Sequence, residues 1–378
     1  MSEFVNDSEA SRRHFHTFDA LRFLAVFKVF LQHMMPVAAF PWFNYVKLGG
    51  YVGVYFFFVL SGFLITYIIC SEKQQSGTIN LKNFFARRVL RIWPLFYLVV
   101  ALCYILPPVL GSMGMSLTGA GYEPRLGWSL LFLENYRMIA TGDLPNVFPL
   151  AVTWSLCIEE HFYIIWGLLL YVVPLKHMPK VIGICLLIGI TSRFIFVQNG
   201  LDPSDILTHI DLFAYGAIPA WLLIKHEQAT VKWVTNIPKW IQAAYIPLLL
   251  AIVLVVSQYW NPVINATLFG CLFSFLLVLI LPKQAFIRVS DKNIFSRLGV
   301  YTYGIYLYHI FIIAACRKLF EKMSFSLDEP LPAISFVIVC LVLTICCSYL
   351  SYRYFEKPFL KLKKYFRKGS KIESLPNG

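Results

Sequence analysis

The sequence predicts an all-α membrane protein: a polytopic bundle of about ten transmembrane helices with both termini in the cytoplasm. Of the 378 residues, 58% are hydrophobic and 14% are Asp, Glu, Lys or Arg. Soluble globular domains hold roughly 45–50% apolar and about 25% charged residues. Apolar runs of about 20 residues, the length that crosses a bilayer, recur from the first fifth of the chain to the last. These observations argue against a soluble enzyme and a disordered chain.

The predicted helices follow one another along the chain with mostly short connections. They lie near residues 17–39, 51–70, 93–110, 149–173, 178–197, 205–225, 240–257, 262–282, 298–318 and 332–355. The first is not a cleavable signal peptide, because Arg22, Lys28 and His33 interrupt its apolar run. We expect a cytoplasmic tail over 1–16, one transmembrane domain over 17–355 and a basic cytoplasmic tail over 356–378, with no soluble domain at either end.

The distribution of positive charge predicts the orientation. With the N-terminus placed in the cytoplasm, 23 of the 33 Lys and Arg residues fall on the cytoplasmic side and six on the other. Because Lys and Arg are enriched in cytoplasmic loops, both termini are expected there. The net charge of +13 then provides a surface for anionic membrane lipid, and no nucleic-acid partner is expected.

Three further features narrow the function. The nine cysteines fall within or at the ends of predicted helices, without metal-ligand spacing, so we expect packing residues and no metal. The sequence shows no internal repeat, which weighs against a transporter built from inverted halves. The long connection near 111–148 contains the amphiphilic stretch WSLLFLENY and is expected on the outer side, near an acceptor site.

Ionisable residues inside membrane spans are costly and mark functional sites by default. The first span contains Arg22 and His33, which are eleven residues apart. Three helical turns place them on one face about 16 Å apart, with Arg22 toward the cytoplasm and His33 toward the outer half. The alternative is that Arg22 reaches the lipid headgroups and His33 is a satisfied buried polar group.

The fourth span opens with TWSLCIEEHFY, which places Glu159 and Glu160 deep in the membrane. Adjacent helical positions diverge by about 100°, so at most one carboxylate points straight at a shared site. One glutamate could hold the His33 ring in the tautomer that a general base needs. The alternative is a structural ion pair with one of three basic residues, Lys28, Arg193 or Arg22.

The stretch NFFARRVLRIWP carries Arg88 and Arg91 on the cytoplasmic side. At a spacing of three they share one helix face, and guanidinium groups bind phosphate in bidentate geometry. The alternative is the juxtamembrane basic cluster that inner loops commonly carry.

Weaker signals lie in three other spans. Ser61 is at mid-depth in SGFLI, where small residues usually indicate close helix packing. Tyr306 and His309 belong to a Tyr/His stripe that more often marks satisfied polar groups in a core, and Asp211 is another buried acid. Together, an inner phosphate-binding face, a deep histidine and an outer loop predict an enzyme that moves an activated group from a cytoplasmic donor to an acceptor across the membrane.

Seven segments occur in a specific order along nearly the whole chain. They are FDALRFLAVFKVFLQH, with its Arg-x10-His spacing, FFFVLSGFLIT, FARRVLRIWPLFY, TWSLCIEEHFYIIW, HIDLFAYGA, LGVYTYGIYLYH and SYLSYRYFEKPF. This ordered set resembles the acyltransferase-3 family of membrane acyltransferases. The resemblance implies a bundle of about ten helices that transfers an acetyl or similar acyl group from acyl-coenzyme A to hydroxyls of surface or exported glycans.

The resemblance also implies roles for individual residues. His33 would be the catalytic base, Arg22 its helix-mate, and Glu159 or Glu160 the orienting acid. The donor site is predicted to comprise Arg22, Arg88, Arg91 and Ser61, and the acceptor site Asp211, Tyr306 and His309. In a two-step route through an acyl-protein intermediate, Ser61 would be the nucleophile.

The chain departs from the family pattern in a few places. Phe23 stands where many relatives have Gly, His161 where Gln is frequent, and His209 where Arg is common beside the Asp. The two histidines bear on the acceptor rather than on the reaction class. Some relatives carry an extra extracytoplasmic hydrolase-like domain, for which this chain has no room.

The sequence therefore predicts an O-acyltransferase of the bacterial inner membrane. Acetyl-coenzyme A would be the donor, and a glycan or lipid-linked glycan the acceptor. The alternative is a transporter or flippase for a lipid-linked or anionic solute, which would use the same buried ions as a proton relay. The identity of the acceptor and the oligomeric state stay open.

Overall fold

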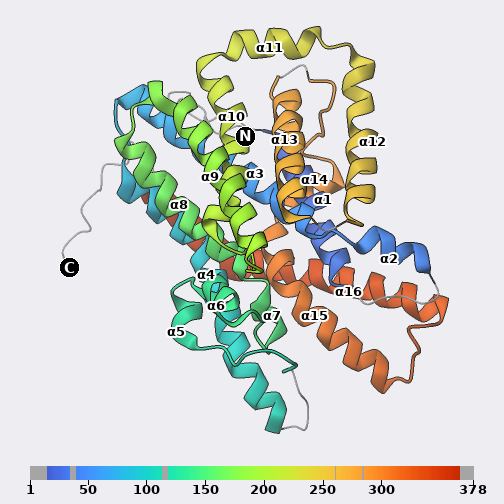
Figure 1. The fold of residues 1–378 in the computed structure, drawn as a ribbon. Coiled ribbons are helices and arrows are strands. Elements are labelled where there is room, and N and C mark those ends of the chain that lie inside the picture. Colours follow the sequence, from blue (N-terminus) through green and yellow to red (C-terminus); the bar gives the residue numbers. More distant parts are fainter. Residues whose placement is uncertain (1–14, 35–39, 113–117, 260, 283–284, 367–378) are drawn as a thin grey trace, which may run out of the picture.

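The computed structural model describes residues 15–34, 40–112, 118–259, 261–282 and 285–366, and these residues form an all-α bundle (Figure 1). Within the described residues, β-type backbone pairing is limited to isolated bridges, such as the one between Thr118 and Val147. The long helices are α1 (Thr17–Gln32), α3 (Tyr51–Ser76), α4 (Leu81–Ser112), α8 (Trp154–Val172), α9 (Met178–Gln198), α10 (Ile206–Lys225), α12 (Lys239–Val256), α13 (Pro262–Ile280), α15 (Thr302–Lys322) and α16 (Pro330–Ser351).

Each predicted transmembrane segment coincides with one of these helices. Among the described residues, eight helical stretches are long and apolar enough to cross a membrane, which confirms a polytopic all-α protein. The two predicted segments that do not qualify are α1 and α15. Helix α1 has 16 residues, fewer than the about 20 that span a bilayer, and α15 is less apolar because of its Tyr/His stripe and basic end.

Helix α4 begins well before the predicted span. The side chain of Asn80 accepts a hydrogen bond from the backbone N–H of Asn83 (2.9 Å), the capping contact that asparagine favours at a helix start. As a result Arg88 and Arg91 belong to the membrane helix itself and are held rigidly.

The tightest packing lies between α3 and α10. A Cβ atom added at Gly62 of α3 would lie 2.0 Å from the carbonyl oxygen of Phe213, and one at Gly216 of α10 would lie 1.8 Å from that of Val59. Only glycine permits this approach at both positions, which confirms the close packing predicted for SGFLI. The core therefore surrounds α3 and α10, whereas α9, α12 and α16 expose most of their apolar surface.

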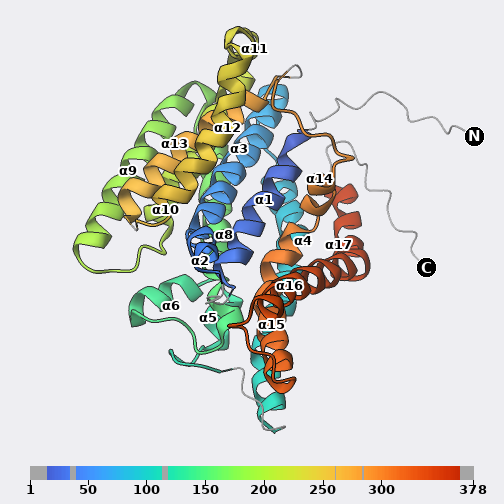
Figure 2. The same ribbon diagram turned by 90° about the vertical axis from the view of Figure 1, so that its right-hand side faces the viewer.

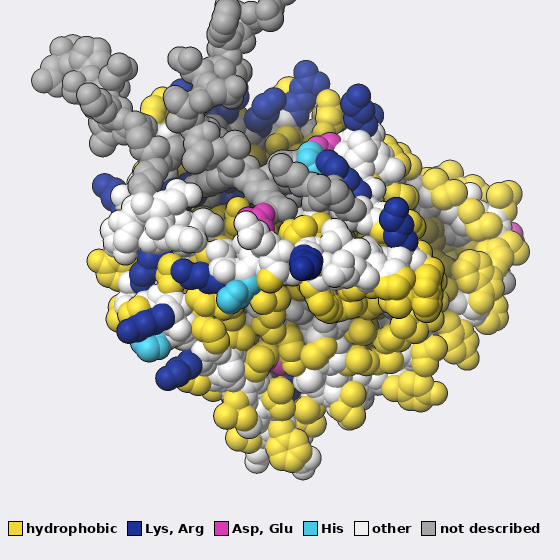
Figure 3. Space-filling view, turned by 90° about the horizontal axis from the view of Figure 1, so that it is seen from above, with side chains coloured by type: hydrophobic (Ala, Val, Ile, Leu, Met, Phe, Trp, Pro, Cys, Tyr) yellow, Lys and Arg dark blue, Asp and Glu magenta, His cyan; other side chains and the backbone are white. Residues whose placement is uncertain are grey.

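The two ends of the bundle differ. The short helices α5 (Leu126–Leu130) and α6 (Glu134–Thr141) lie at the end opposite α11 (Glu227–Asn236) (Figures 1 and 2). Viewed from the α11 end, Lys and Arg side chains are scattered over the face, and hydrophobic side chains cover the sides of the bundle (Figure 3). A membrane protein with apolar flanks and charged ends has this form.

Part of the segment predicted as a C-terminal tail is folded. Helix α16 continues through a π-helical turn, η2 (Tyr352–Glu356), into α17 (Lys357–Lys361) and η3 (Leu362–Phe366). Arg87 of α4 donates a hydrogen bond to the carbonyl oxygen of Phe366 (2.6 Å). This segment therefore packs against α4 beside its arginines. Residues 1–14 and 367–378 of the predicted tails lie outside the described residues.

Candidate active site

Three arginines from two helices come together, as the donor-site prediction requires. Arg22 of α1 pairs with Asp19 one turn earlier (Nη1 to Oδ1, 2.6 Å), and it lies close enough to Arg91 of α4 for the two charges to repel each other. Arg88 lies over the ring of Tyr163, 5.7 Å from its centroid, and its buried Nε has no hydrogen-bond partner. Such a cluster has donors left for an anionic ligand.

The folded C-terminal segment adds charge at the same level. Lys363 of η3 interacts electrostatically with Arg88 and Arg91, and Glu356 of η2 attracts Arg91. Sequence reasoning missed both residues, because it assigned them to a free tail.

Glu159 faces α3 and the arginines. Its Oε1 accepts a hydrogen bond from the hydroxyl of Ser61 (2.5 Å), and the Tyr163 hydroxyl lies 3.4 Å from the same Ser61 oxygen. Arg88 and Arg91 both attract Glu159. The fold therefore joins Ser61 and Glu159 with the arginines in one polar group. Tyr163 was overlooked, although its place one turn after Glu159 was a visible signal.

Glu160 points in another direction, as adjacent helical positions predict. Its Oε2 accepts a hydrogen bond from the indole of Trp93 on α4 (3.2 Å), and its buried Oε1 has no hydrogen-bond partner. Trp93 is a second contact that the sequence did not single out.

His33 ends α1, and its partner is another histidine. His33 Nδ1 lies 3.0 Å from the carbonyl oxygen of Val29 and 3.2 Å from Nε2 of His309 on α15. His309 is 1% exposed, whereas the His33 side chain is reachable from outside the protein. Two histidines thus meet at the junction of α1 and α15.

The structure gives His33 and the two glutamates other hydrogen-bond partners than the predicted ones, so orientation of His33 by a glutamate stays a prediction. Among the described residues, Glu159 bonds to Ser61 and Glu160 to Trp93, while His33 bonds to Val29 and His309. The reason is geometric: α8 turns its carboxylates toward α3 and α4, and the end of α1 packs on α15. The alternative ion pair of a glutamate with Lys28 is not formed either, because Lys28 donates to the Val46 carbonyl (2.5 Å).

Tyr306 and His309 line the interior face of α15. The Tyr306 hydroxyl lies 2.6 Å from the Ser155 oxygen and donates to the carbonyl oxygen of Val152 (2.9 Å). One turn earlier, Tyr303 donates to the carbonyl oxygen of Ile92 on α4 (2.7 Å). The stripe therefore runs from α4 to the His33 end of α1.

Asp211 lies elsewhere. It forms an ion pair with Arg193 of α9, whose Nε also donates to the carbonyl oxygen of Thr208 (2.8 Å). Both charged side chains are essentially unexposed. This contact ties α9 to α10, and a role for Asp211 at an acceptor site stays a prediction.

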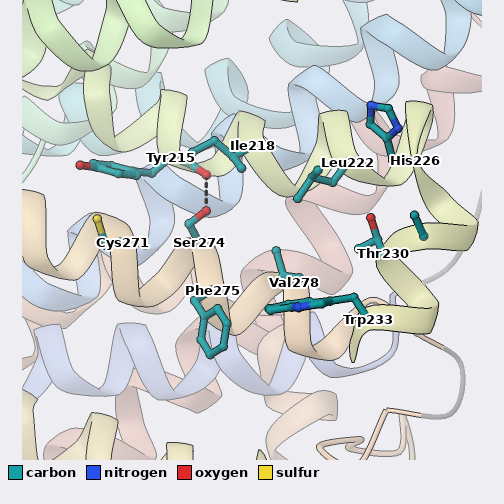
Figure 4. Close-up of a pocket in the computed structure, with 11 residues that line it drawn as sticks. Tyr215, Ile218, Leu222, His226, Thr230, Trp233, Cys271, Ser274, Phe275 and Val278 are labelled. Atoms are coloured by element: carbon teal, nitrogen blue, oxygen red, sulfur yellow. Dashed lines mark hydrogen bonds between the residues drawn. The ribbon is translucent and has the colours of Figure 1, made fainter. Parts of the chain in front are cut away.

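An apolar groove of about 530 Å³ lies between α10, α11 and α13 (Figure 4). Trp233, Phe275 and Val278 line it, and Ser274 donates to the carbonyl oxygen of Tyr215 at its wall (2.7 Å). None of the predicted site residues contributes to this groove, which separates it from the candidate active site. Among the described residues, no three His, Cys, Asp or Glu side chains gather as metal ligands do.

Comparison with known proteins identifies relatives along the chain. A Listeria monocytogenes peptidoglycan O-acetyltransferase, OatA, is 29% identical over 376 residues, covering 93% of this chain and 56% of that protein. A Staphylococcus aureus protein named "Putative O-acetyltransferase" is 26% identical over 370 residues, covering 92% and 58%. A Bacillus subtilis protein named "Putative peptidoglycan O-acetyltransferase YrhL" is 26% identical over 368 residues, covering 92% and 55%.

The chain thus spans little more than half the length of these relatives. No solved structure gave a significant match. The model of the acyltransferase-3 family, described as an acyltransferase domain, matches residues 15–353. Because this match covers nearly the whole chain and every residue of the predicted site, the protein belongs to the acyltransferase-3 family, as its motifs predicted.

Proposed function

We propose that this chain is a membrane O-acyltransferase, in the simplest case an O-acetyltransferase, that moves an acyl group from cytoplasmic acyl-coenzyme A to a hydroxyl of a surface or exported glycan in a bacterial inner membrane. The observation that carries the proposal is the placement of Arg22 and His33 at the two ends of α1. The arginines of α4 surround the first end, and the polar stripe of α15 leads to the second. The names of the relatives support the O-acetyl chemistry.

The donor would bind through its phosphates. Arg88 and Arg91 share one face of α4, and Arg88 has an unused, buried Nε donor. Charge-assisted hydrogen bonds from guanidinium to phosphate are strong and directional. Lys363 lies beside the same arginines, so the folded C-terminal segment closes one side of the proposed phosphate site.

In the direct route, neutral His33 removes the proton from the acceptor hydroxyl. The acceptor oxygen attacks the thioester carbonyl, the carbon–sulfur bond breaks, and the coenzyme A thiolate takes the proton from His33. The products are the O-acyl ester and free thiol, and His33 is regenerated. His33 is exposed, so an acceptor could approach it.

A two-step route uses the same residues. Ser61 donates its hydroxyl hydrogen bond to Glu159, so Glu159 is positioned to receive that proton as Ser61 attacks the thioester. The carbon–sulfur bond breaks, and coenzyme A leaves as the thiol with the proton that Glu159 received. The acceptor hydroxyl then gives its proton to His33 and attacks the acyl-Ser61 ester; the bond between Ser61 Oγ and the acyl carbon breaks, and Oγ takes the proton from His33, so that both residues are regenerated.

Binding of acetyl-coenzyme A tests the proposal. Calorimetry on the purified protein in detergent should show saturable binding that is lost in the Arg88→Ala/Arg91→Ala variant. The matched control is Lys176→Ala/Lys180→Ala, which removes two exposed charges at and just before the start of α9 and should bind normally. Failure of the folded wild type to bind acetyl- or longer acyl-coenzyme A contradicts the proposal.

A transporter or flippase for a lipid-linked or anionic solute is the second candidate, favoured by the deeply buried charges of Arg193 and Asp211. A transporter does not consume acyl-coenzyme A. Release of free thiol that depends on His33 therefore separates the two functions.

A further inference from the structure

Two histidines meet where α1 ends against α15. The Nε2 atom of His309 lies 3.2 Å from Nδ1 of His33, and the ring centroids are 4.9 Å apart at an interplanar angle of 63°. Each ring nitrogen is either a donor or an acceptor, and which one it is follows from its other partners.

The partners of His309 assign its proton. Its Nδ1 lies 2.6 Å from the carbonyl oxygen of Tyr306. A carbonyl oxygen only accepts, so His309 carries its hydrogen on Nδ1. In the neutral ring Nε2 is then bare, and it presents a lone pair to His33.

The same reasoning assigns His33. Its Nδ1 lies between two acceptors, the Val29 carbonyl oxygen at 3.0 Å and the bare Nε2 of His309. The hydrogen of His33 is therefore on Nδ1, where it is shared between the two acceptors. The lone pair of the neutral ring remains on Nε2.

We propose that His309 is a positioning residue that, with the Val29 carbonyl, holds His33 in the Nδ1–H tautomer. Nε2 of His33 is then the atom that takes the proton from the hydroxyl group of the acceptor substrate. This inference rests on the proposed function, in which His33 is the base. When Nε2 takes that proton, the Nδ1–H hydrogen bond to His309 becomes charge-assisted and strengthens. His309 thereby fills the orienting role that the third member of a catalytic triad fills elsewhere.

The surroundings of His309 suit this role. Its side chain is 1% exposed, so the ring cannot turn freely. One turn earlier, Tyr306 bonds to Val152, which lies just before α8, and to Ser155 of α8, which fixes this part of α15 relative to the bundle. His33, in contrast, is exposed.

Nitrogen-15 NMR of histidine-labelled protein tests the assignment without any turnover. Long-range proton–nitrogen correlation spectra distinguish the two neutral tautomers, and the His33 signals are those missing from a His33→Ala spectrum. We expect protonated Nδ1 and bare Nε2 for both His33 and His309 at a pH where the rings are neutral. A His33 ring with its hydrogen on Nε2 overturns the inference.

Substitution of His309 tests its effect on turnover. His309→Leu removes the acceptor and should lower kcat about 10- to 100-fold with the donor KM unchanged, as expected for a lost hydrogen bond to a charged group. His309→Gln keeps an acceptor oxygen near the position of Nε2 and should recover most of that loss. His226→Leu, which changes a histidine of the apolar groove, is the matched control.

Two results would overturn the role of His309: wild-type kcat in His309→Leu, or equal loss in folded His309→Gln and His309→Leu. Failure of the proposed function looks different, because the wild type would then release no thiol from any acyl-coenzyme A. If His309→Leu does not fold, the wild-type NMR spectrum still decides the tautomer.

Discussion

Two groups of charge inside the bundle differ in how far they are exposed. Arg193 and Asp211 lie between α9 and α10 and pair with each other at 1% and 0% exposure. In the other group, Arg91 is exposed and Arg88 faces aromatic rings with an unpartnered Nε. Each group also keeps buried polar atoms without a hydrogen-bond partner, Arg193 Nη1 and Asp211 Oδ2 in the first and Arg88 Nε in the second. The first pair joins two helices out of reach of any ligand, whereas the second can be reached, so accessibility rather than unused donors separates the two groups.

The largest expected effect is on the chemical step at His33, at the other end of α1 from the arginine group. His33→Ala should lower the rate of acyl transfer about 10²- to 10⁴-fold, because it removes the proposed general base. Its side chain is exposed, so expression and thermal stability should remain normal. Thiol release from acetyl-coenzyme A measures the effect, with His177→Ala on a connection as the control. Near-normal acylation by His33→Ala would contradict the mechanism.

Breaking the buried pair between Arg193 and Asp211 should lower the stability of the protein. Arg193→Ala leaves the Asp211 charge buried without its partner and should lower the free energy of unfolding by about 3–5 kcal/mol. Unfolding in detergent measures this loss.

The control for Arg193→Ala is the exposed pair between Arg317 and Glu321, 2.7 Å apart. Because exposed pairs contribute little, Arg317→Ala should cost less than about 1 kcal/mol. Equal costs for the two variants would mean that burial does not distinguish these pairs.

The arginines of α4 should affect donor binding rather than the chemical step. Arg88→Ala/Arg91→Ala should raise the donor KM about 100-fold with kcat little changed, since the lost phosphate contacts act in the ground state and the transition state alike. Steady-state kinetics with varied acetyl-coenzyme A measures this. An unchanged KM would remove the phosphate-binding role.

The smallest effect is expected at Ser61. In the direct route, Ser61→Ala costs one hydrogen bond to Glu159, worth about 1.5–3 kcal/mol in gross terms but less where water replaces it, so the rate should fall about tenfold or less. Complete loss, together with an acyl-Ser61 adduct found in the wild type by mass spectrometry, would favour the two-step route.

Local features of the sequence predicted most of the fold. Apolar segment length alone located the long helices, because a membrane requires about 20 residues for each crossing. The relative placement of Arg22 and His33 could also be predicted from their spacing, since both residues belong to one helical segment. Likewise, the divergence of Glu159 and Glu160 follows from helix geometry, whatever the rest of the bundle does.

Contacts between distant segments could not be read in this way. The partner of His33 is 276 residues away, so only the packing of α1 on α15 decides that it is His309 and neither glutamate. The packing of residues 352–366 against α4 likewise depends on a π-helical turn and on the hydrogen bond from Arg87 to the Phe366 carbonyl oxygen.

The sequence by itself determined the helices, their order and the residue types available for acyl transfer, because these depend on hydropathy and on spacing within single helices. The tertiary structure decided which charges are buried together, which are exposed, and which side chain His33 meets. Those outcomes depend on the approach of side chains from different helices, which no local pattern in the chain encodes.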